Sequence, residues 1–315
     1  MTATRPHRPV AVLTGPTGTG KTDIALALAR EFPLEIVSVD SAQVYRGLDI
    51  GSAKPSAEIR ARVPHHLVDL VDAAGSYSAG QFVRDAARAI EDIEARGRVP
   101  LLVGGTMLYL RALTGGIAAL PEGSAELRAG IDAEAARDGW PALHARLAGI
   151  DPAAAARIHP NDAQRIQRAL EVHAVGGRPI SELQSATKPA LEREFMVCAL
   201  FPGDRARLHA DLDRRFDQMM VAGLLDEVRG LHARGDLTVA HPAIRAVGYR
   251  QLWAHLDGAH ALDVAVARAM AATRQLAKRQ MTWLRSMANI RTFDPHDAQS
   301  FVGIRESLMR VFYPL

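Results

Sequence analysis

The sequence predicts an α/β fold in which helices flank a parallel sheet and a helical insertion interrupts the chain. Three short apolar runs predict strands, at residues 10–14, 34–39 and 99–103, because each is rich in β-branched or aliphatic side chains and ends beside a polar residue or a glycine. Helical spacing follows the first run at residues 23–31 and precedes the third at residues 79–96. Strands that alternate with helices are typical of a parallel sheet.

The middle of the chain predicts a separate helical domain. Residues 115–188 carry Ala- and Arg-rich helical patterns, and the next strand candidate is at residues 195–201. We therefore expect a core domain of residues 1–115 and 192–315, with a helical insertion domain at residues 116–191.

The composition is that of a folded protein. A chain of 315 residues that is 48% hydrophobic can bury one large core or two modest ones. The net charge is +3, and nearly all basic residues are arginine, which suits phosphate and RNA contacts; the base composition of the genome would give the same bias. The single cysteine, Cys198, excludes an internal disulfide and a multi-cysteine zinc site. We find neither a signal peptide nor a run of about 18 apolar residues, so we expect a cytoplasmic protein with no membrane segment.

The strongest single motif is GPTGTGKT, between the first predicted strand and the helix after it. Its glycines let backbone N–H groups converge on phosphate oxygens, the Lys21 side chain adds a positive charge, and the Thr22 hydroxyl can bind Mg²⁺. The motif predicts a P-loop for a di- or triphosphate, as in proteins that bind ATP; the alternative is a glycine-rich turn with a chance Gly-Lys-Thr. The predicted diphosphate-binding residues are Gly15, Pro16, Thr17, Gly18, Thr19, Gly20, Lys21 and Thr22.

Polar residues also follow the second and third predicted strands. Asp40 ends the second strand, where a carboxylate lies at the ligand crevice of an open α/β sheet. Asp40 could hold a metal, act as a general base, or only cap the next segment. Thr106 follows two glycines after the third strand and could donate to a phosphate or acceptor oxygen, or cap a helix. No apolar run ends in Asp-Glu, which weakens an interpretation as an ATPase.

A helical pattern at residues 161–173 has two distinct faces. On a helical wheel its polar side chains fall within about 100° of one another, opposite the core side chains. The polar face, which we expect to be available for contacts, consists of Gln164, Gln167, Arg168 and Glu171, and the core face of Ile166, Leu170 and His173.

Two long helical patterns, at residues 205–234 and 261–287, follow the last predicted strand. In the second pattern, Arg274, Lys278 and Arg285 fall within about 40° on the wheel, opposite Leu276, Trp283 and Met287. This basic stripe is either a solvated surface or a contact with a phosphate backbone. Between the two patterns, residues 245–250 (RAVGYR) could cap a diphosphate or contact RNA.

Seven segments, in order from about residue 10 to residue 290, resemble the tRNA dimethylallyltransferases, enzymes that prenylate N6 of the adenosine just 3′ of the anticodon. They are GPTGTGKT, DSAQVYRGLDIGSAKP, VGGTMLYLRAL, IHPNDAQRIQRALEV, RFDQMMVAGLLDEV, RAVGYRQLW and RQLAKRQMTWLR. The P-loop alone would not distinguish this family, whereas DSAQVYRGLDIG and HPNDAQRIQRAL do. The chain lacks the cysteines of the zinc finger in eukaryotic members, so it resembles the bacterial form.

The resemblance implies a P-loop NTPase-like fold whose loop binds dimethylallyl diphosphate, with Mg²⁺ on Thr22 and the charge of Lys21 neutralising diphosphate as it leaves. Asp40 would orient N6 of adenosine 37 and accept its proton, with Thr106 beside it. The products would be N6-isopentenyladenosine, in tRNAs that read codons beginning with U, and diphosphate. The catalytic residues implied are Asp40, Thr106 and Lys21.

The resemblance also implies a tRNA surface. The acceptor base would leave its stack in the anticodon loop, and the insertion domain would grip the anticodon stem-loop. The residues implied are Asp40, Ser41, Ala42, Gln43, Thr106, Arg128, Gln164, Arg165, Ile166, Gln167, Arg168, Arg245, Ala246, Val247, Gly248, Tyr249 and Arg250; the basic stripe adds Arg274 and Lys278. We expect a monomer.

Three functions stay open at this point: a tRNA prenyltransferase, a nucleotide kinase or NTPase, and a binding module that senses a nucleotide. A variant of the first would prenylate free adenine nucleotides. The polar faces at residues 161–173 and 273–287 favour a large acceptor, because a small one needs no extended polar surface.

Overall fold

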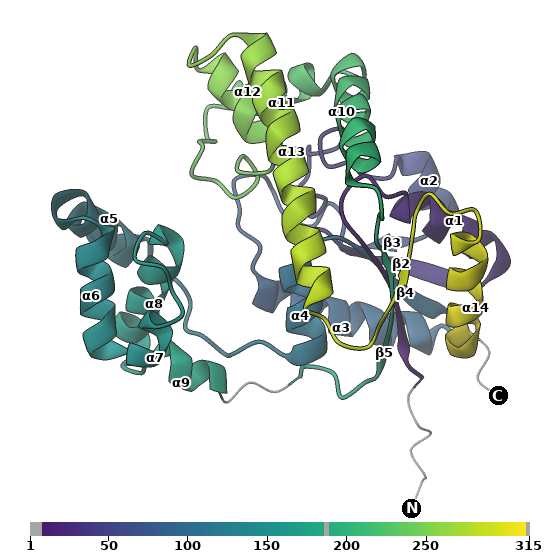
Figure 1. The fold of residues 1–315 in the computed structure, drawn as a ribbon, viewed down its shortest axis with the longest axis horizontal. Helices are drawn as coiled ribbons and strands as arrows, with labels where there is room; N and C mark the ends of the chain where they lie inside the picture. Colours follow the sequence, from purple (N-terminus) through teal and green to yellow (C-terminus); the bar gives the residue numbers. More distant parts are fainter. Residues whose placement is uncertain (1–7, 186–188, 313–315) are drawn as a thin grey trace, which may run out of the picture. The chain divides into compact units, whose positions relative to one another are not determined.

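The computed structural model describes residues 8–185 and 189–312. The chain divides into two compact units, Met1–Thr114 with Leu191–Leu315, and Gly115–Ala190 (Figure 1). The first unit is built on a sheet and the second consists of helices. None of the described helices is both long enough and apolar enough to cross a membrane.

Within the described residues, the sheet has six strands in the order β3-β2-β4-β1-β5-β6, and every pairing is parallel. The strands are β1 (Val10–Thr14), β2 (Leu34–Val39), β3 (His65–His66), β4 (Val99–Gly104), β5 (Phe195–Leu200) and β6 (Ile290–Phe293). The four longest were predicted to within one residue. The sequence analysis missed β3 and β6, because they are short, only partly buried and contain no apolar run.

The side chains of each central strand point alternately into two apolar cores, which explains why these strands are completely buried. In β1, Val10 and Val12 face one core cluster, whereas Ala11 and Leu13 face another. Side chains on a strand point alternately to its two faces, so a strand with helices on both sides is apolar throughout. One face packs against α3 (Ala79–Ala95) and α4 (Met107–Gly115), and the other against α1 (Lys21–Glu31) and α14 (Ser300–Phe312) (Figure 1).

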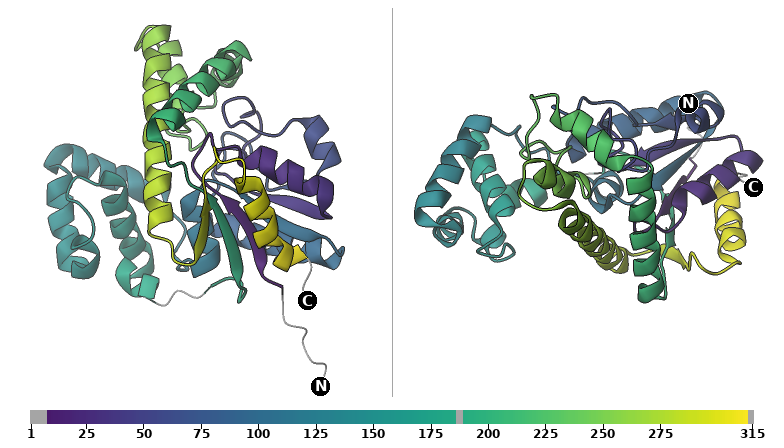
Figure 2. Two further views of the ribbon diagram at one scale, coloured as in Figure 1. Left: turned by 45° about the vertical axis from the view of Figure 1, so that its right-hand side comes forward. Right: turned by 90° about the horizontal axis from the view of Figure 1, so that it is seen from above.

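The remaining helices of the first unit are α2 (Ala57–Arg62), α10 (Arg205–Val221), α11 (Leu224–His232), α12 (Tyr249–Leu256) and α13 (Leu262–Arg285). The prediction of one helix over residues 205–234 was wrong: the chain turns between α10 and α11 at Gly223, whose φ of +101° an L side chain rarely adopts. In Figure 1 and the left view of Figure 2, α13 runs from beside α11 and α12 down toward α4 and the sheet. This path brings its side chains to the P-loop.

The second unit consists of α5 (Ala125–Asp138), α6 (Trp140–Ile150), α7 (Pro152–Ala155), α8 (Ala163–Gly176) and α9 (Ile180–Ser185). Its core cluster includes Leu143, Leu147 and Leu170. The side chain of Asp162 caps α8 by accepting a hydrogen bond from the backbone N–H of Arg165. The unit spans Gly115–Ala190, where the sequence analysis placed the insertion at residues 116–191.

Candidate functional site

The GPTGTGKT segment forms a tight loop between β1 and α1. Gly20 precedes the helix with a φ of +76°, a conformation that suits glycine. The ammonium group of Lys21 donates hydrogen bonds to the carbonyl oxygens of Gly15 (3.0 Å) and Pro16 (2.7 Å), and the Thr19 hydroxyl donates to the Pro16 oxygen (2.8 Å). Lys21 and Thr22 are the first two residues of α1. The backbone N–H groups in this first turn lack partners within the helix. Such an end attracts phosphate.

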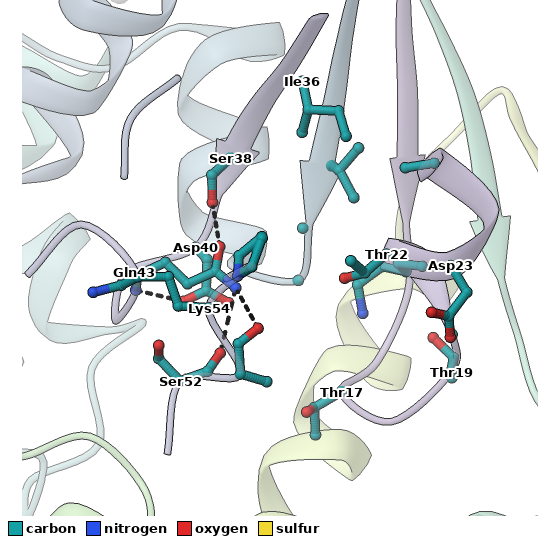
Figure 3. A pocket seen from close by; sticks show the side chains of 18 of the residues that line it. Thr17, Thr19, Thr22, Asp23, Ile36, Ser38, Asp40, Gln43, Ser52 and Lys54 are labelled. Carbon is teal, nitrogen blue, oxygen red and sulfur yellow. Dashed lines mark hydrogen bonds between the residues drawn. The ribbon is translucent and has the colours of Figure 1, made fainter. Parts of the chain in front are cut away.

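A cavity of about 480 Å³, called here the P-loop cavity, lies against this loop. Thr17, Thr19, Thr22 and Asp23 lie on one side of it, facing Asp40, Gln43 and Ser52 (Figure 3). A second cavity of about 390 Å³, called here the adjoining cavity, is lined by Ser41, Thr106, Leu108, Arg245, Arg279 and Trp283, among others. The two cavities share five lining residues, Thr17, Asp40, Ser52, Gly105 and Gln280. A ligand on the P-loop and a ligand in the adjoining cavity would therefore meet at Asp40.

Asp40 directly follows β2 and uses one carboxylate oxygen for local structure. Its Oδ1 atom accepts hydrogen bonds from the backbone N–H groups of Ala42 (2.8 Å) and Gln43 (3.3 Å). Its Oδ2 atom has no hydrogen-bond partner among the described residues. The capping role considered for Asp40 is thus present, and the second oxygen stays available to a ligand.

Thr106, after β4, ties the ends of two neighbouring strands together. Its hydroxyl accepts a hydrogen bond from the backbone N–H of Ser41 (3.0 Å), and its O–H donates to the Ser41 hydroxyl (3.3 Å). Its own N–H donates to the carbonyl oxygen of Val39 (3.1 Å). These contacts fix the loop that carries Asp40.

Gln43 connects Asp40's loop to the segment at Ser52. Its Oε1 atom accepts from the Ser38 hydroxyl (2.8 Å), and its amide nitrogen donates to the carbonyl oxygens of Ser52 and Ala53 (both 3.3 Å) (Figure 3). The side chain of Gln43 is therefore committed to the protein on both ends, and its role is to shape the cavity wall.

Lys21 and Arg215 line the P-loop cavity, as does Lys54, which is paired with Asp49 and Asp69. Burial lowers the pKa of Lys21 to about 8; the charge of Asp40 opposes this shift and that of Arg215 adds to it. Burial also lowers the pKa of Arg215, against the charges of Asp40 and Asp23, yet a guanidinium stays protonated. Desolvated cations bind a phosphate strongly, because less water competes for them. The sequence analysis did not single out Arg215 as a site residue, although Arg215 is the first residue of the matching segment RFDQMMVAGLLDEV, on α10.

The face of α13 at the adjoining cavity differs from the one expected. Leu276, Arg279, Gln280 and Trp283 line that cavity. The expected basic stripe faces another way: Lys278 and Arg285 line a small separate cavity of about 50 Å³ with Arg205 and His209, and Arg274 is paired with Asp213 at 2.5 Å. Leu276 and Trp283, on the apolar side of the helical wheel, thus belong to the wall of the adjoining cavity.

Residues 245–250 divide between cavity and core. Arg245, Ala246 and Val247 line the adjoining cavity, and the Arg245 guanidinium donates to the carbonyl oxygen of Ala240 (2.7 Å). Tyr249 is fully buried and donates its hydroxyl to Glu227 (2.5 Å). The expectation that Tyr249 contacts tRNA is corrected, since its side chain reaches no surface. Gly248 is buried as well, and Arg250 is exposed outside both cavities.

The expected tRNA face of the second unit also needs correction. Ile166 is fully buried in the core, so its side chain is structural. Glu171, expected on the available face, is buried too: it accepts from the backbone N–H of Ser124 (2.9 Å) and pairs with Arg128 (2.8 Å) and Arg168 (2.6 Å). Both arginines stay half-exposed around this carboxylate. Exposed side chains at the start of α8 are Gln164 and Arg165; Gln167 is half-buried and donates to Asp132 (2.6 Å).

Comparisons with known proteins agree over most of the chain. The family model described as IPP transferase matches residues 43–287. A tRNA dimethylallyltransferase of Burkholderia thailandensis is 58% identical over 284 residues, covering 89% of this chain and 88% of that protein; one of Bordetella petrii is 57% identical over 281 residues, covering 88% and 90%. Among solved structures, the tRNA isopentenylpyrophosphate transferase of Bacillus halodurans is 35% identical, covers 97% of both chains and has a TM-score of 0.71. A eukaryotic dimethylallyltransferase acting on tRNA is 27% identical, with a TM-score of 0.81, covering 96% of this chain and 78% of its own.

Proposed function

Because the chain belongs to the IPP transferase family, we propose that it transfers the dimethylallyl group of dimethylallyl diphosphate to tRNA. The acceptor in this proposal is N6 of adenosine 37, just 3′ of the anticodon, in tRNAs that read codons beginning with U. The observation that carries the proposal is the shared wall of the two cavities at Asp40. An NTPase transfers phosphate to water and needs no second cavity, and the match to the IPP transferase family argues against a nucleotide kinase.

The P-loop cavity suits the leaving group of this reaction. The diphosphate binds at the N-terminus of α1, with Lys21 and Arg215 beside it as positive charges. An allylic carbon tolerates positive charge, so the main catalytic task is to stabilise the departing anion. On binding, the Lys21 ammonium exchanges its contacts with Gly15 and Pro16 for the phosphate oxygens.

Mg²⁺ fits the residues at the same cavity. The ion prefers oxygen ligands and keeps several waters, and the Thr22 hydroxyl and the carboxylates of Asp23 and Asp40 line the P-loop cavity. In the proposal, Thr22 would hold the ion together with the diphosphate, and the ion would supply positive charge toward the leaving group.

The adjoining cavity takes the acceptor base, flipped out of the anticodon loop. The lone pair of exocyclic N6 is delocalised into the ring, so N6 needs help to attack carbon. The Oδ2 atom of Asp40 accepts the N6 proton as the C–N bond forms, while its Oδ1 atom holds the carboxylate in place through Ala42 and Gln43. Thr106 keeps the Asp40 loop in position through Ser41.

The second unit supplies contacts to the anticodon stem-loop in this proposal. Gln164 and Arg165 are exposed at the start of α8, and the half-exposed guanidinium groups of Arg128 and Arg168 are pre-oriented by Glu171. A guanidinium group held in a fixed orientation suits phosphate oxygens, because its N–H donors form a planar fork. We further propose that the enzyme acts as a monomer in the cytoplasm.

A transfer assay tests the proposal. The protein is incubated with dimethylallyl diphosphate, Mg²⁺ and tRNA that lacks the modification, and the digested nucleosides are analysed by mass spectrometry. We expect N6-isopentenyladenosine from the wild type and none from Lys21→Ala. The same assay with AMP in place of tRNA shows whether the enzyme prenylates a free adenine nucleotide instead of tRNA. If no prenylated nucleoside forms and the protein hydrolyses ATP instead, the proposed transferase activity is rejected.

A further inference from the structure

Gln280 of α13 forms a bridge between the two loops that meet at the shared cavity wall. Its side-chain Oε1 atom accepts a hydrogen bond from the backbone N–H of Thr17 (2.9 Å), and its Nε2 atom donates to the carbonyl oxygen of Gly105 (2.8 Å). Its side chain is buried, with 8% of the residue exposed. Gln280 thus links the P-loop to the Thr106 loop, although 263 residues separate it from Thr17 and 175 from Gly105.

The chemistry of the bridge requires a side-chain amide of this length. A neutral amide carries an acceptor and a donor at one planar end, so it can satisfy an N–H group and a carbonyl oxygen at once. Gly105 allows the close approach, because a Cβ atom there would lie 2.6 Å from Nε2 of Gln280. A buried polar group at this place is expected to be fully paired, and both ends of Gln280 are.

The two bridged loops carry the two halves of the proposed reaction. Thr17 belongs to the loop that binds diphosphate. Gly105 precedes Thr106, whose hydroxyl holds Ser41 next to Asp40. Gln280 itself lines both the P-loop cavity and the adjoining cavity. A shift of either loop would change the distance between the allylic carbon and N6, and small misplacements of this kind cost rate without a loss of binding.

We propose that Gln280 is a positioning residue that couples the P-loop to the Thr106 loop, so that diphosphate bound on one loop orders the acceptor side on the other. Its effect on turnover rests on the function proposed above. The coupling between the loops does not, because it can be measured with inorganic diphosphate alone.

The first test is kinetic and compares Gln280→Met with Gln275→Met. Methionine keeps the approximate length and removes both hydrogen bonds; Gln275 is exposed on the same helix and lines neither cavity. With dimethylallyl diphosphate and unmodified tRNA, we expect Q280M to lower kcat about 100-fold. The KM for dimethylallyl diphosphate should change less than about threefold, because the P-loop contacts stay. The control Q275M should match the wild type, and a Q280M enzyme with wild-type kcat overturns the proposal.

The second test measures hydrogen exchange with inorganic diphosphate and Mg²⁺. In the wild type and Q275M, diphosphate should slow exchange in the peptide that covers residues 104–108; in Q280M this protection should be lost while the P-loop peptide is still protected. If the wild type shows this protection but transfers no prenyl group, the proposed function fails and the coupling stands. If diphosphate protects residues 104–108 equally in Q280M, the coupling is refuted whatever the activity.

Gln280→Glu serves as the second variant, in case Q280M does not fold. Its carboxylate can still accept from the Thr17 N–H but cannot donate to Gly105. We expect a cooperative melting transition, with the protection of residues 104–108 lost. Loss of the folded state in both variants would assign Gln280 a purely structural role and overturn the proposal.

Discussion

A carboxylate oxygen of Glu227, on α11, accepts a hydrogen bond from the backbone N–H of Ile50 at 2.7 Å, joining segments 177 residues apart. The same carboxylate accepts from the N–H groups of Asp49 (3.0 Å) and Gly51 (3.2 Å) and from the Tyr249 hydroxyl. Through these contacts, the C-terminal helices hold the loop that ends at Ser52, a residue of both cavities.

Glu227→Ala should destabilise the protein, because three backbone N–H groups and a buried tyrosine hydroxyl would lose their acceptor. An unpaired buried donor costs about 1–3 kcal/mol, so we expect a lower unfolding midpoint in urea together with weaker turnover. Asp226→Asn is the matched control, since the Asp226 side chain is 77% exposed. Equal midpoints for the two variants would show that the Glu227 contacts contribute nothing to stability.

Asp40→Asn should separate chemistry from binding. Asparagine can still accept from the N–H groups of Ala42 and Gln43, so the loop is preserved, but it cannot accept a proton. We expect turnover to fall by about 10²–10⁴-fold, with diphosphate affinity, measured by calorimetry, close to that of the wild type. Equal losses of turnover and of affinity would place Asp40 in the metal site instead.

Diphosphate binding should depend on the charge of Lys21. Its pKa in the free protein is lowered to about 8 by burial, so above pH 8 the amine is mostly neutral and must take up a proton when the anion binds. Affinity for dimethylallyl diphosphate should therefore fall by only about twofold between pH 7 and pH 8 and more steeply above pH 8, by up to about tenfold per pH unit. Lys21→Met should bind weakly and without this dependence. A wild-type affinity that is constant from pH 7 to pH 9.5 would contradict the lowered pKa.

Two neighbouring residues of α13 test which face of the helix meets tRNA. Arg279 lines the adjoining cavity, and Lys278 lines the separate small cavity with Arg205. Arg279→Ala should weaken tRNA binding and reduce its dependence on salt by about one counterion. Lys278→Ala should have the smaller effect on both. A larger effect of Lys278→Ala than of Arg279→Ala would indicate that the basic stripe contacts tRNA instead.

The sequence predicted those parts of the site that lie directly at strand ends. The P-loop, Asp40 and Thr106 each follow a strand whose apolar run is visible locally, and parallel strands bring their carboxyl ends to one edge of the sheet. Arg215, Arg279 and Gln280 were missed, because they come from helices brought to this edge only by the tertiary fold. A wheel also cannot distinguish a core face from a cavity wall, since both are rich in apolar side chains.

The resemblance of motifs located segments more reliably than it located side chains. Ile166 and Tyr249 lie inside two of the matching segments, yet both are fully buried. A motif identifies a stretch of chain, whereas the direction of each side chain follows from the packing of that stretch.

The central claim is that the P-loop holds the leaving group of a carbon transfer. Its most direct test measures diphosphate and prenylated nucleoside in the same reaction of dimethylallyl diphosphate with tRNA. We predict one diphosphate released for each prenylated adenosine, no release without tRNA, and no release from ATP. Diphosphate formed without a prenylated nucleoside, or orthophosphate released from ATP at a comparable rate, would contradict the account.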